Sequence, residues 1–339
     1  MEKILSVVIP TYNMEALLPR CLDSFILPQN YMDKMEILVV NDGSKDKSLE
    51  IALKYAQQYP NTYKVIDKSN GNYGSCINAA LKVAMGKYFR ICDADDCYEN
   101  SNLSQYLDFL ISTDADIVFT PYGVYNRDDL VSTFDVAMEY RGGVFSIDDI
   151  NWSSANLPKF RAMHTMTVKK EVLASHNYYQ TEGISYTDTQ FIFYSCLYAQ
   201  TCTFFNAVIY LYFLGRDGQT MSRAAMVKSH MHFYENTNRM LDDYLKVEFE
   251  ISDNRARVLE LCFVATFLFF VQAVLCNFPN QREKMKLIDD ILRRIEDSRR
   301  SVLIEQMLLS STLYKFWRKK HVPAIVFNVL YRLKNCFRK

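Results

Sequence analysis

Three aspartates follow an apolar run within four positions, and their spacing suits a divalent cation. The run 88–92 leads directly into Asp93, Asp95 and Asp96. We expect the run to be a buried strand, because it comes after a helical pattern and a glycine stop at Gly86. Like charges this close raise one another's pKa. A hard cation such as Mg²⁺ or Mn²⁺ relieves the repulsion and keeps coordination positions for phosphate oxygens.

The same acids also have a purely structural interpretation. A helical pattern begins near Asn102, and negative charge is favourable close to a helix N-terminus. If a cation binds instead, we expect Asp95 to be its principal ligand and Asp93 to assist. The acids by themselves leave both interpretations open, because short motifs are weak evidence alone.

Strands and helices alternate along the chain upstream of these acids. Apolar runs predict buried strands, and apolar residues at helical spacing predict the helices between them. The predicted strands are 4–10, 35–40, 63–66 and 88–92, and the predicted helices are 15–27, 46–59 and 75–85. This alternation predicts parallel βαβ units. The fold class is therefore α/β, a Rossmann-like, mostly parallel sheet flanked by helices.

A polar segment follows each predicted strand. Ligands of such sheets bind at the carboxyl ends of the strands, so we expect segments 11–13, 41–44, 71–74 and 93–96 to meet at one edge. This convergence is the main argument from the residues for a ligand site.

The side chains in these segments suit a nucleotide. Asp42 can accept hydrogen bonds from a nucleobase imide or a ribose hydroxyl. Gly71 and Gly74 permit close backbone approach, and Asn78 offers amide donors to a diphosphate or ribose. Neither GxGxxG nor GxxxxGK[ST] occurs in the chain, so dinucleotide and P-loop sites are not favoured.

Five short motifs stand in order in the first hundred residues: Val-Val-Ile-Pro-Thr-Tyr-Asn (7–13), Val-Val-Asn-Asp-Gly-Ser (39–44), Asn-Gly-Asn-Tyr-Gly-Ser-Cys-Ile-Asn (70–78), Gly-Lys-Tyr-Phe (86–89) and Asp-Ala-Asp-Asp (93–96). Together they resemble glycosyltransferase family 2, over roughly residues 1–220. The resemblance implies a GT-A fold, a nucleotide-sugar donor, a Mg²⁺ or Mn²⁺ ion held by Asp93 and Asp95, and inversion at the anomeric carbon. The chain departs from the family at Asn41, where many members have a second Asp, and at Ile77, where Arg is common.

The nucleotide-binding residues that we expect lie in these motifs and in one later loop: Pro10, Thr11, Tyr12, Asn13, Asp42, Gly71, Asn72, Gly74, Asn78, Asp93 and Arg216. Segment 215–222 resembles the family's segment after the last strand, which closes near the diphosphate. Arg216 in that segment is suited to bind phosphate oxygens in bidentate fashion. A surface arginine without a role is an equal alternative.

A second candidate site lies around Asp188. Inverting transfer needs a base that deprotonates the acceptor hydroxyl. The family places it in a Glu-Asp-x-x-Phe-like segment that opens a helix, which Asp188 and Phe191 match, while Thr187 replaces the Glu. The alternative is that Asp188 or Thr187 only caps the helix that follows. If the base lies elsewhere, the neighbouring Glu182 is the next candidate.

Other segments carry weaker signals. Residues 123–145 predict a hairpin or acceptor-side loops, and the run 204–213 predicts one apolar strand. Trp152 either stacks on a sugar or, as is more usual, is partly buried. His230 and His232 fall on opposite sides of a helix, so they suit surface or packing roles rather than a metal site.

Composition limits the class of protein. The 339 residues are 49% hydrophobic and 23% charged with net charge zero, which predicts a folded chain and argues against a dedicated nucleic-acid binder. Nine cysteines without a CxxC pair, and no signal-peptide pattern, indicate reduced thiols in a cytosolic protein.

The last third of the chain has a helical pattern, so we divide the chain into a GT-A domain at 1–222 and a helical region at 223–339. The apolar stretch 261–275 is shorter than the roughly 20 residues of a spanning helix, which favours a buried or interfacial helix. From 306 to 339 there are eight Lys and Arg and no acids. The interleaved apolar residues of 314–339 predict an amphipathic helix on the inner face of an anionic membrane, or else one packed on the protein.

Together, these observations favour a metal-dependent inverting glycosyltransferase. We expect it to use a UDP-sugar and to act on a glycan or lipid-linked acceptor in surface polysaccharide synthesis. One alternative is a catalytically silent nucleotide-sugar or glycan binding module. A sugar nucleotidyltransferase is less favoured, because it would need a basic triphosphate loop and residues 11–19 contain no Lys or Arg.

Overall fold

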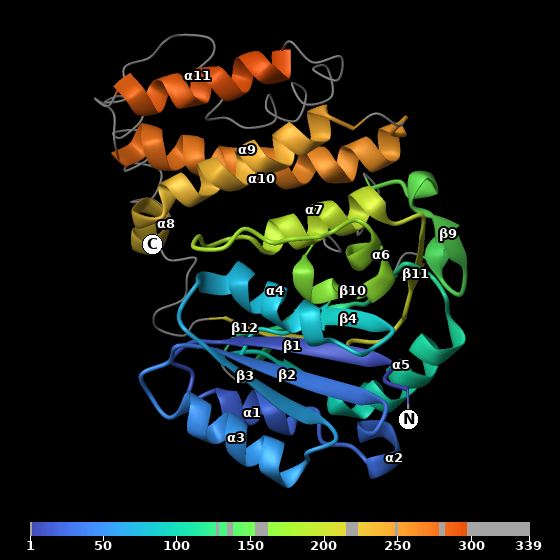
Figure 1. Ribbon diagram of the computed structural model, residues 1–339. Helices are drawn as coiled ribbons and strands as arrows, with labels where there is room; N and C mark the ends of the chain where they lie inside the picture. The colour runs from blue at the N-terminus through green and yellow to red at the C-terminus, as the bar shows by residue number, and fades with distance from the viewer. Residues whose placement is uncertain are drawn as a thin grey trace. The chain divides into compact units, whose positions relative to one another are not determined.

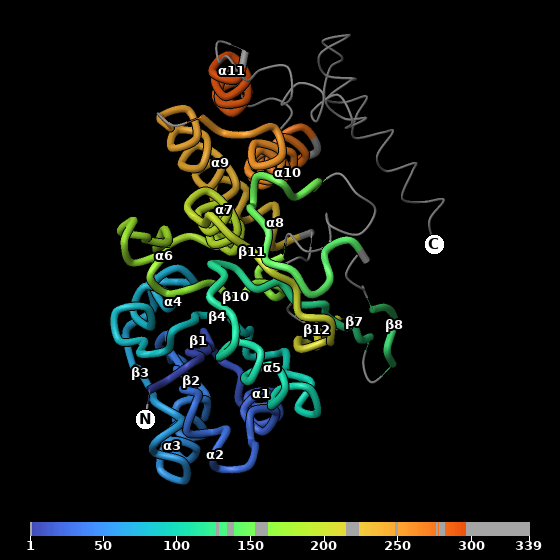
Figure 2. The backbone as a smooth tube through the Cα atoms, turned by 90° about the vertical axis from the view of Figure 1, so that its right-hand side faces the viewer, coloured from blue at the N-terminus to red at the C-terminus, as the bar shows by residue number. Residues whose placement is uncertain are grey.

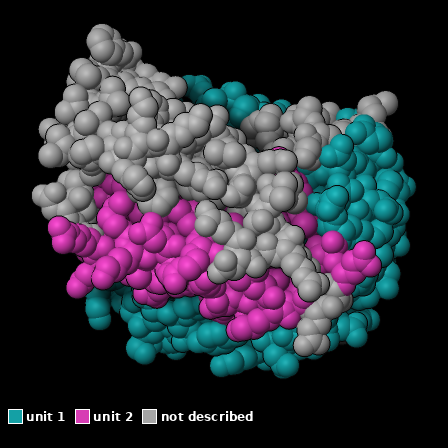
Figure 3. All heavy atoms as spheres, turned by 90° about the horizontal axis from the view of Figure 1, so that it is seen from above, with its two compact units in different colours: residues 1–217, 252–255 teal, residues 218–251, 256–339 magenta. Residues whose placement is uncertain are grey.

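The computed structural model describes residues 2–126, 129–133, 138–152, 162–214, 223–247, 250–277 and 282–296. The described chain forms two compact units, coloured separately in Figure 3. One unit comprises Met1–Asp217 and Ser252–Arg255, and the other comprises Gly218–Ile251 and Ala256–Lys339. The proposed boundary after Ser222 falls in residues 215–222, which lie outside the described parts.

The larger unit is built on an eight-stranded sheet of order β3-β2-β1-β4-β10-β6-β11-β9. Its strands are β1 (Leu5–Thr11), β2 (Met35–Asp42), β3 (Tyr63–Lys68), β4 (Tyr88–Ile91), β6 (Ile117–Phe119), β9 (Val144–Ser146), β10 (Met166–Lys169) and β11 (Thr201–Phe204). The first four strands are parallel. The antiparallel β10 lies between β4 and β6. The prediction of a mostly parallel α/β sheet is therefore confirmed.

Helices cover both faces of this sheet (Figures 1 and 2). They are α1 (Leu18–Asp23), α2 (Gln29–Met32), α3 (Ser48–Gln58), α4 (Asn72–Val83), α5 (Asn100–Ser112), α6 (Lys170–Ser175) and α7 (Asp188–Tyr198). In Figure 1, α1 and α3 lie below the sheet, and α4 and α7 lie above it. The helix predicted at 15–27 is shorter, because Pro19 lies in its first turn and the Ser24 hydroxyl binds the Cys21 carbonyl at its end.

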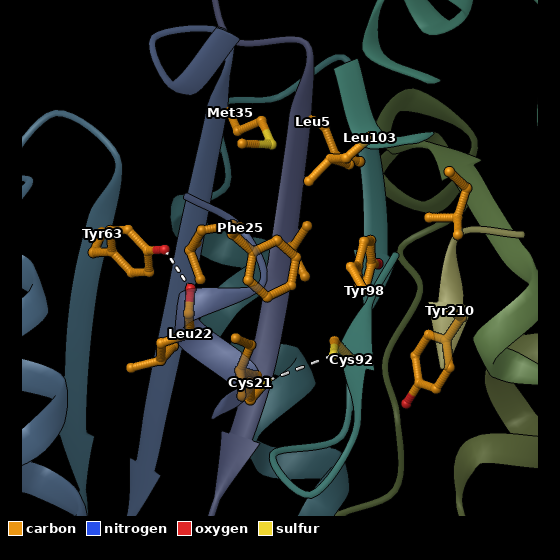
Figure 4. Close-up of a cluster of buried hydrophobic side chains, with 14 of the residues drawn as sticks. Leu5, Cys21, Leu22, Phe25, Met35, Tyr63, Cys92, Tyr98, Leu103 and Tyr210 are labelled. Carbon is orange, nitrogen blue, oxygen red and sulfur yellow. Dashed lines mark hydrogen bonds between the residues drawn. The ribbon is translucent and has the colours of Figure 1, made fainter. Parts of the chain in front are cut away.

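A buried cluster joins α1 and α5 to the lower face of the sheet (Figure 4). The rings of Phe25 and Tyr98 are 4.5 Å apart. The Tyr63 hydroxyl donates to the Leu22 carbonyl at 2.7 Å, so β3 is tied to α1. The side chain of Cys92, directly before the acids, belongs to this cluster. The acidic segment therefore starts from a rigid, fully packed position.

A second, four-stranded sheet lies in the same unit. Its order is β5 (Cys97–Tyr98), β12 (Tyr210–Leu214), β7 (Tyr122–Asn126) and β8 (Asp129–Thr133). The hairpin predicted within 123–145 exists as β7 and β8. The single strand predicted for 204–213 is wrong, because β11 ends at Phe204 and the chain crosses to the second sheet before β12 begins. An apolar run cannot reveal such a crossing, since apolar residues continue from one strand to the next.

The smaller unit is helical, as predicted for this region. It contains α8 (Arg223–Lys228), α9 (His230–Leu245), most of α10 (Asp253–Asn277) and α11 (Arg282–Glu296). The apolar stretch 261–275 is the end of the 25-residue α10. The predicted stretch begins too late, because Arg255 and Glu260 interrupt the apolar pattern in the first part of the helix. Arg255 forms an ion pair with Asp148 at 2.7 Å, and Glu260 accepts a hydrogen bond from Tyr244.

Helix α10 is long and apolar enough to cross a membrane by length and composition alone. The core helix of a soluble protein has the same signature, and most of this helix is buried. Within α9, His230 is buried and its Nδ1 lies 2.8 Å from the Val227 carbonyl, consistent with a packing role. The basic tail 306–339 lies outside the described residues.

A buried carboxylate ties β2 to the turn before β4. Glu36 is fully buried and accepts hydrogen bonds from Ser6 Oγ at 2.6 Å, from Lys64 Nζ at 2.9 Å and from the Met85 N–H. Gly86 N in turn donates to Ser6 Oγ at 2.8 Å. Burial alone would raise the pKa of Glu36, but the hydrogen bonds from Met85, Ser6 and Lys64 outweigh it and lower the pKa.

We expect Glu36→Leu to lower the free energy of unfolding by about 1–3 kcal/mol at pH 7, because the substitution leaves buried hydrogen-bond donors without an acceptor. Because the pKa of Glu36 is lowered in the folded state, its contribution to the free energy of unfolding is complete at pH values above the ordinary pKa of a Glu side chain. It is lost as pH falls through the lowered pKa. The difference between the two proteins in urea unfolding should therefore shrink in acid.

Glu50→Leu is the matched control, because Glu50 pairs with Lys54 on the exposed face of α3. Its unfolding free energy should stay within about 0.5 kcal/mol of wild type. Equal losses in the two variants would show that the Glu36 network does not stabilise the fold.

Candidate functional site

The acidic loop and three other polar loops lie at one edge of the larger sheet. In the parallel register Thr11 pairs with Asn41, so β1 and β2 end side by side, and β4 runs parallel to β1. The loops are also bonded to one another. Asn13 Oδ1 accepts from the Lys45 N–H at 2.7 Å, and Asn13 N donates to Ser44 Oγ at 3.0 Å.

The three acids share one small region but have different surroundings. Oxygen atoms of Asp93, Asp95 and Asp96 all lie within 4.8 Å of one another. Asp96 is almost fully buried, and its two oxygens accept from Tyr210 Oη at 2.6 Å and from the Phe213 N–H at 2.9 Å. Asp93 and Asp95 are half-buried. Asp96 therefore anchors β12, and the other two carboxylates are better placed for a ligand.

Charge repulsion within this cluster contributes to the raised pKa of Asp96. Burial raises that pKa well above its usual value, and the carboxylates of Asp93 and Asp95 raise it further. The hydrogen bonds from Tyr210 and Phe213 oppose the shift. A donor set of clustered carboxylate oxygens fits a hard divalent cation, which would relieve this repulsion.

Tyr73, on the first turn of α4, is hydrogen-bonded to the acidic cluster and is affected by the charge of Asp188. Its hydroxyl donates to Asp93 Oδ1 at 2.9 Å. Burial raises the pKa of Tyr73 well above its usual value, and the charges of Asp93 and then Asp188 raise it further. Tyr73 belongs to the motif 70–78 but had no predicted role, because its two carboxylate neighbours are distant in sequence.

Tyr212 on β12 is a second residue without a predicted role. Burial raises its pKa to about 12, and the charges of all three clustered acids and of Asp188 contribute. The His164 ring stacks on Tyr212 with centroids 5.3 Å apart. No motif marked these residues: Tyr212 lies on β12 of the second sheet, and His164 lies in the segment directly before β10 of the larger sheet.

Asp188 is the first residue of α7. Burial raises the pKa of its carboxyl group, while the backbone N–H groups of Thr189 and of Asp188 itself lower it. Thr187 does not cap the helix with its side chain. Its hydroxyl accepts from Gln180 Nε2 at 2.9 Å instead, so the cap interpretation of Thr187 is wrong. The Asp188 carboxyl group contacts the N–H groups of the first turn of α7. This contact is compatible both with a general base and with a helix cap at Asp188.

Asn78 holds the segment in front of α7. Its amide Nδ2 donates to the Gln180 carbonyl at 2.8 Å and to Glu182 Oε1 at 2.9 Å, and its Oδ1 accepts from the Gln180 N–H. Gly74 contributes to the same packing, because a Cβ there would lie 2.1 Å from the Thr181 carbonyl oxygen. The structure thus gives both residues a positioning role, and their contact with a nucleotide stays a prediction.

Asp42 is buried at the end of β2 and is bonded within the protein. Its Oδ1 accepts from Lys68 Nζ at 2.6 Å and from the Gly71 N–H at 2.9 Å. Asn41, where family members often have an Asp, donates from Nδ2 to Asp67 Oδ1 at 2.7 Å. Lys68 had no predicted role.

The other predicted nucleotide contacts differ in exposure. The Thr11 hydroxyl is buried and donates to the Ile9 carbonyl at 3.1 Å, whereas Tyr12 is 47% exposed. Asn13, Asn72 and Tyr186 have φ values of 54°, 64° and 65°, and such backbone strain tends to gather at functional sites. Pro10 lies within β1, and Arg216 lies outside the described residues.

Trp152 does not lie at the site surface. It is 1% exposed and packs edge-on against Phe119, with ring centroids 5.6 Å apart. The interpretation of Trp152 as a sugar-stacking residue is therefore wrong.

Comparisons with known proteins agree with this geometry. Residues 6–171 match the family model for glycosyl transferase family 2. Glycosyltransferase GlyG of Streptococcus pneumoniae is 27% identical over 277 residues, which cover 77% of this chain and 87% of GlyG.

Two other relatives match over shorter stretches. The uncharacterized glycosyltransferase MG025 homolog of Mycoplasma pneumoniae is 40% identical over 97 residues, 28% of this chain and 32% of that protein. The minor teichoic acid biosynthesis protein GgaB of Bacillus subtilis is 36% identical over 118 residues, 34% of this chain and 13% of GgaB. The matches thus span a third or less of these two relatives.

Solved structures confirm the GT-A fold. S. aureus TarS 1–349 in complex with UDP-GlcNAc has a TM-score of 0.57 and 17% identity, covering 91% of this chain and 92% of TarS 1–349. The mannosyltransferase PcManGT of Pyrobaculum calidifontis, in complex with GDP-Man and Mn²⁺, has a TM-score of 0.51 and 14% identity, covering 97% and 88%.

The different surroundings of the acids predict different mutant phenotypes. We expect Asp95→Asn to weaken Mn²⁺ binding, measured by calorimetry, by at least about tenfold, as for loss of a metal ligand or its support. Asp96→Asn should affect Mn²⁺ affinity less and should lower the free energy of unfolding by about 1–3 kcal/mol, because its partners are buried. Equal Mn²⁺ affinity in wild type and Asp95→Asn would exclude Asp95 as a ligand.

Proposed function

Residues 6–171 of this chain are a glycosyl transferase family 2 domain, and from that premise we propose that the protein is an inverting glycosyltransferase. It transfers a sugar from a nucleotide-sugar donor to a hydroxyl group of an acceptor. The observation that supports this most is the Tyr73 hydroxyl, which donates to Asp93 Oδ1 at 2.9 Å and whose pKa is raised, after burial, by the charges of both Asp93 and Asp188.

The donor diphosphate binds at the acidic cluster. Asp93 and Asp95 fit a Mg²⁺ or Mn²⁺ ion by donor type and spacing. Such an ion, when bound, neutralises charge on the departing diphosphate. Tyr73 fixes the orientation of Asp93 through its hydrogen bond, and Asp96 fixes the loop through Tyr210 and Phe213.

Asp188 acts as the general base. A sugar hydroxyl is a poor nucleophile at neutral pH, so its proton must leave as the new bond forms. The Asp188 carboxylate accepts that proton, the acceptor oxygen bonds to the anomeric carbon, and the nucleoside diphosphate departs from the opposite face. Burial raises the pKa of Asp188, which makes its carboxylate a stronger base than an exposed one.

The donor is a UDP-sugar and the acceptor is a glycan or lipid-linked glycan of a surface polysaccharide. TarS, which shares the fold, was solved with UDP-GlcNAc. GgaB, which is related in sequence, takes part in teichoic acid biosynthesis. These relatives support the proposed substrate classes. Metal-dependent turnover of UDP-sugars would also exclude the silent binding module.

We place the protein in the cytoplasm, at the inner face of the membrane. The eight basic residues of 306–339, with no acid among them, support contact with anionic lipid at about 1 kcal/mol for each residue near the surface.

Truncation after Ser311 tests the membrane proposal. The truncated protein should lose binding to vesicles that contain anionic lipid, measured by sedimentation, and should keep donor hydrolysis. Vesicles of neutral lipid are the control, and neither protein should bind them strongly. Equal sedimentation of both proteins with anionic vesicles would refute the role of the tail.

Substitution of Asp188 tests the chemistry. Asp188→Asn should reduce the transfer rate by about 10²–10⁴-fold, the usual contribution of general base catalysis. Donor affinity and melting temperature should stay near wild type, because Asn caps a helix about as well as Asp.

Glu182→Gln is the matched control in the same segment, since a Gln oxygen can still accept from Asn78. This variant should remain active. If Asp188→Asn is fully active while Glu182→Gln is not, the base is Glu182 and the assignment to Asp188 is wrong.

A further inference from the structure

Lys68 binds the buried carboxylate at the end of β2. Lys68 and Asp42 are cross-strand partners on β3 and β2. Lys68 Nζ lies 2.6 Å from Asp42 Oδ1, and the same oxygen accepts from the Gly71 N–H at 2.9 Å. The Asp42 side chain is only 5% exposed. One of its two oxygens is therefore used by the protein itself.

The side-chain ammonium group of Lys68 has no N–H left to contact a ligand. An ammonium group has three donors, and here they bind Asp42 Oδ1, the Ser69 carbonyl at 2.7 Å and Ser75 Oγ at 2.7 Å. Ser75 Oγ donates onward to the Asn72 carbonyl. Lys68 thus holds Asp42 in place together with the loop that opens α4, and its role is positioning.

The second oxygen of Asp42 has a different environment. All hydrogen bonds that the described N–H and ammonium groups make to this carboxylate use Oδ1. The buried thiol of Cys76 also interacts with Asp42, but a thiol is a weak donor. Asp42 therefore offers a single strong acceptor, Oδ2, to a ligand.

Nucleobases differ in how many donors they present to a carboxylate. Uracil and thymine present one N–H between two carbonyl groups, which one acceptor oxygen satisfies. Guanine presents adjacent N1–H and N2–H donors, which need both oxygens of a carboxylate. Adenine and cytosine place an acceptor nitrogen beside their amino group, and that nitrogen is repelled by a negative carboxylate.

We propose that Lys68 sets base selectivity at this site by occupying Asp42 Oδ1, so that the donor nucleotide carries a pyrimidine imide rather than guanine. This inference rests on the proposed function and on the prediction from the sequence that Asp42 accepts a hydrogen bond from the nucleobase imide. It adds a positioning residue outside the motifs and a reason for the choice of uridine diphosphate.

The test compares dissociation constants for UDP and GDP by calorimetry in the presence of Mn²⁺. Wild type should bind UDP at least about tenfold more tightly than GDP, the scale of one lost bidentate contact. Lys68→Met frees Oδ1 for the second guanine donor, so the preference for UDP should fall severalfold or disappear. Loss of the Lys68 positive charge weakens the binding of UDP and of GDP equally, so this effect cancels in the ratio of their dissociation constants.

Lys64→Met is the matched control. Lys64 lies on the same strand and pairs with the carboxylate of Glu36 at 2.9 Å, far from the loop edge. This variant should keep the wild-type ratio of UDP to GDP affinity. An unchanged ratio in Lys68→Met, or an equal change in both variants, would overturn the role of Lys68 while leaving the glycosyltransferase proposal intact.

A probe of wild type makes the test independent of whether Lys68→Met folds. N3-methyl-UDP lacks the imide donor and should bind at least about tenfold more weakly than UDP. Equal affinity for the two nucleotides, or tighter binding of GDP than of UDP, would overturn the inference. Failure of wild type to bind any nucleoside diphosphate would instead refute the proposed function, and the inference with it.

Discussion

The site depends on the hydrogen bond between Tyr210 Oη and the buried Asp96 carboxylate, 2.6 Å long. A buried carboxylate next to two others is unfavourable unless it is well bonded. Tyr210 and the Phe213 N–H supply those bonds from β12, so the second sheet is tied to the end of β4. Tyr212 lies on the same strand, and burial and then the charges of the acids raise its pKa.

A buried arginine on the strand that leads to the acids also holds the site in place through hydrogen bonds. Arg90 on β4 is fully buried, and its Nη1 and Nη2 donate to hydroxyl and carbonyl oxygens of Tyr106, Thr120, Thr167 and His164. These partners come from α5, from the end of β6 and from the chain around β10, which runs antiparallel to β4. Arg90 thus fixes the strand that carries the acids, and the rings of Tyr98 and Tyr106 lie close to its guanidinium.

Most polar groups around the site are bonded to the protein before any ligand binds. Asn78 holds the Gln180 backbone, Thr187 accepts from the Gln180 amide, and Lys68 holds Asp42. Fixed partners of this kind preorganise the few groups that remain for substrate. This arrangement explains why several motif residues have structural rather than direct contacts in the structure.

The sequence by itself determined the parallel α/β order, the edge at which the polar loops meet and the family motifs. These features follow from local periodicity and from short segments, which need no knowledge of distant contacts. Only the tertiary structure separated Asp96 from Asp93 and Asp95, because Asp96 is bonded to Tyr210, 114 positions away. It also brought Asn78 to Gln180 across 102 positions and divided the 204–213 run between two sheets. The roles of Tyr73 and Lys68 also required the tertiary structure. The fold determines that they contact Asp93 and Asp42, and the local pattern of residues does not indicate these contacts.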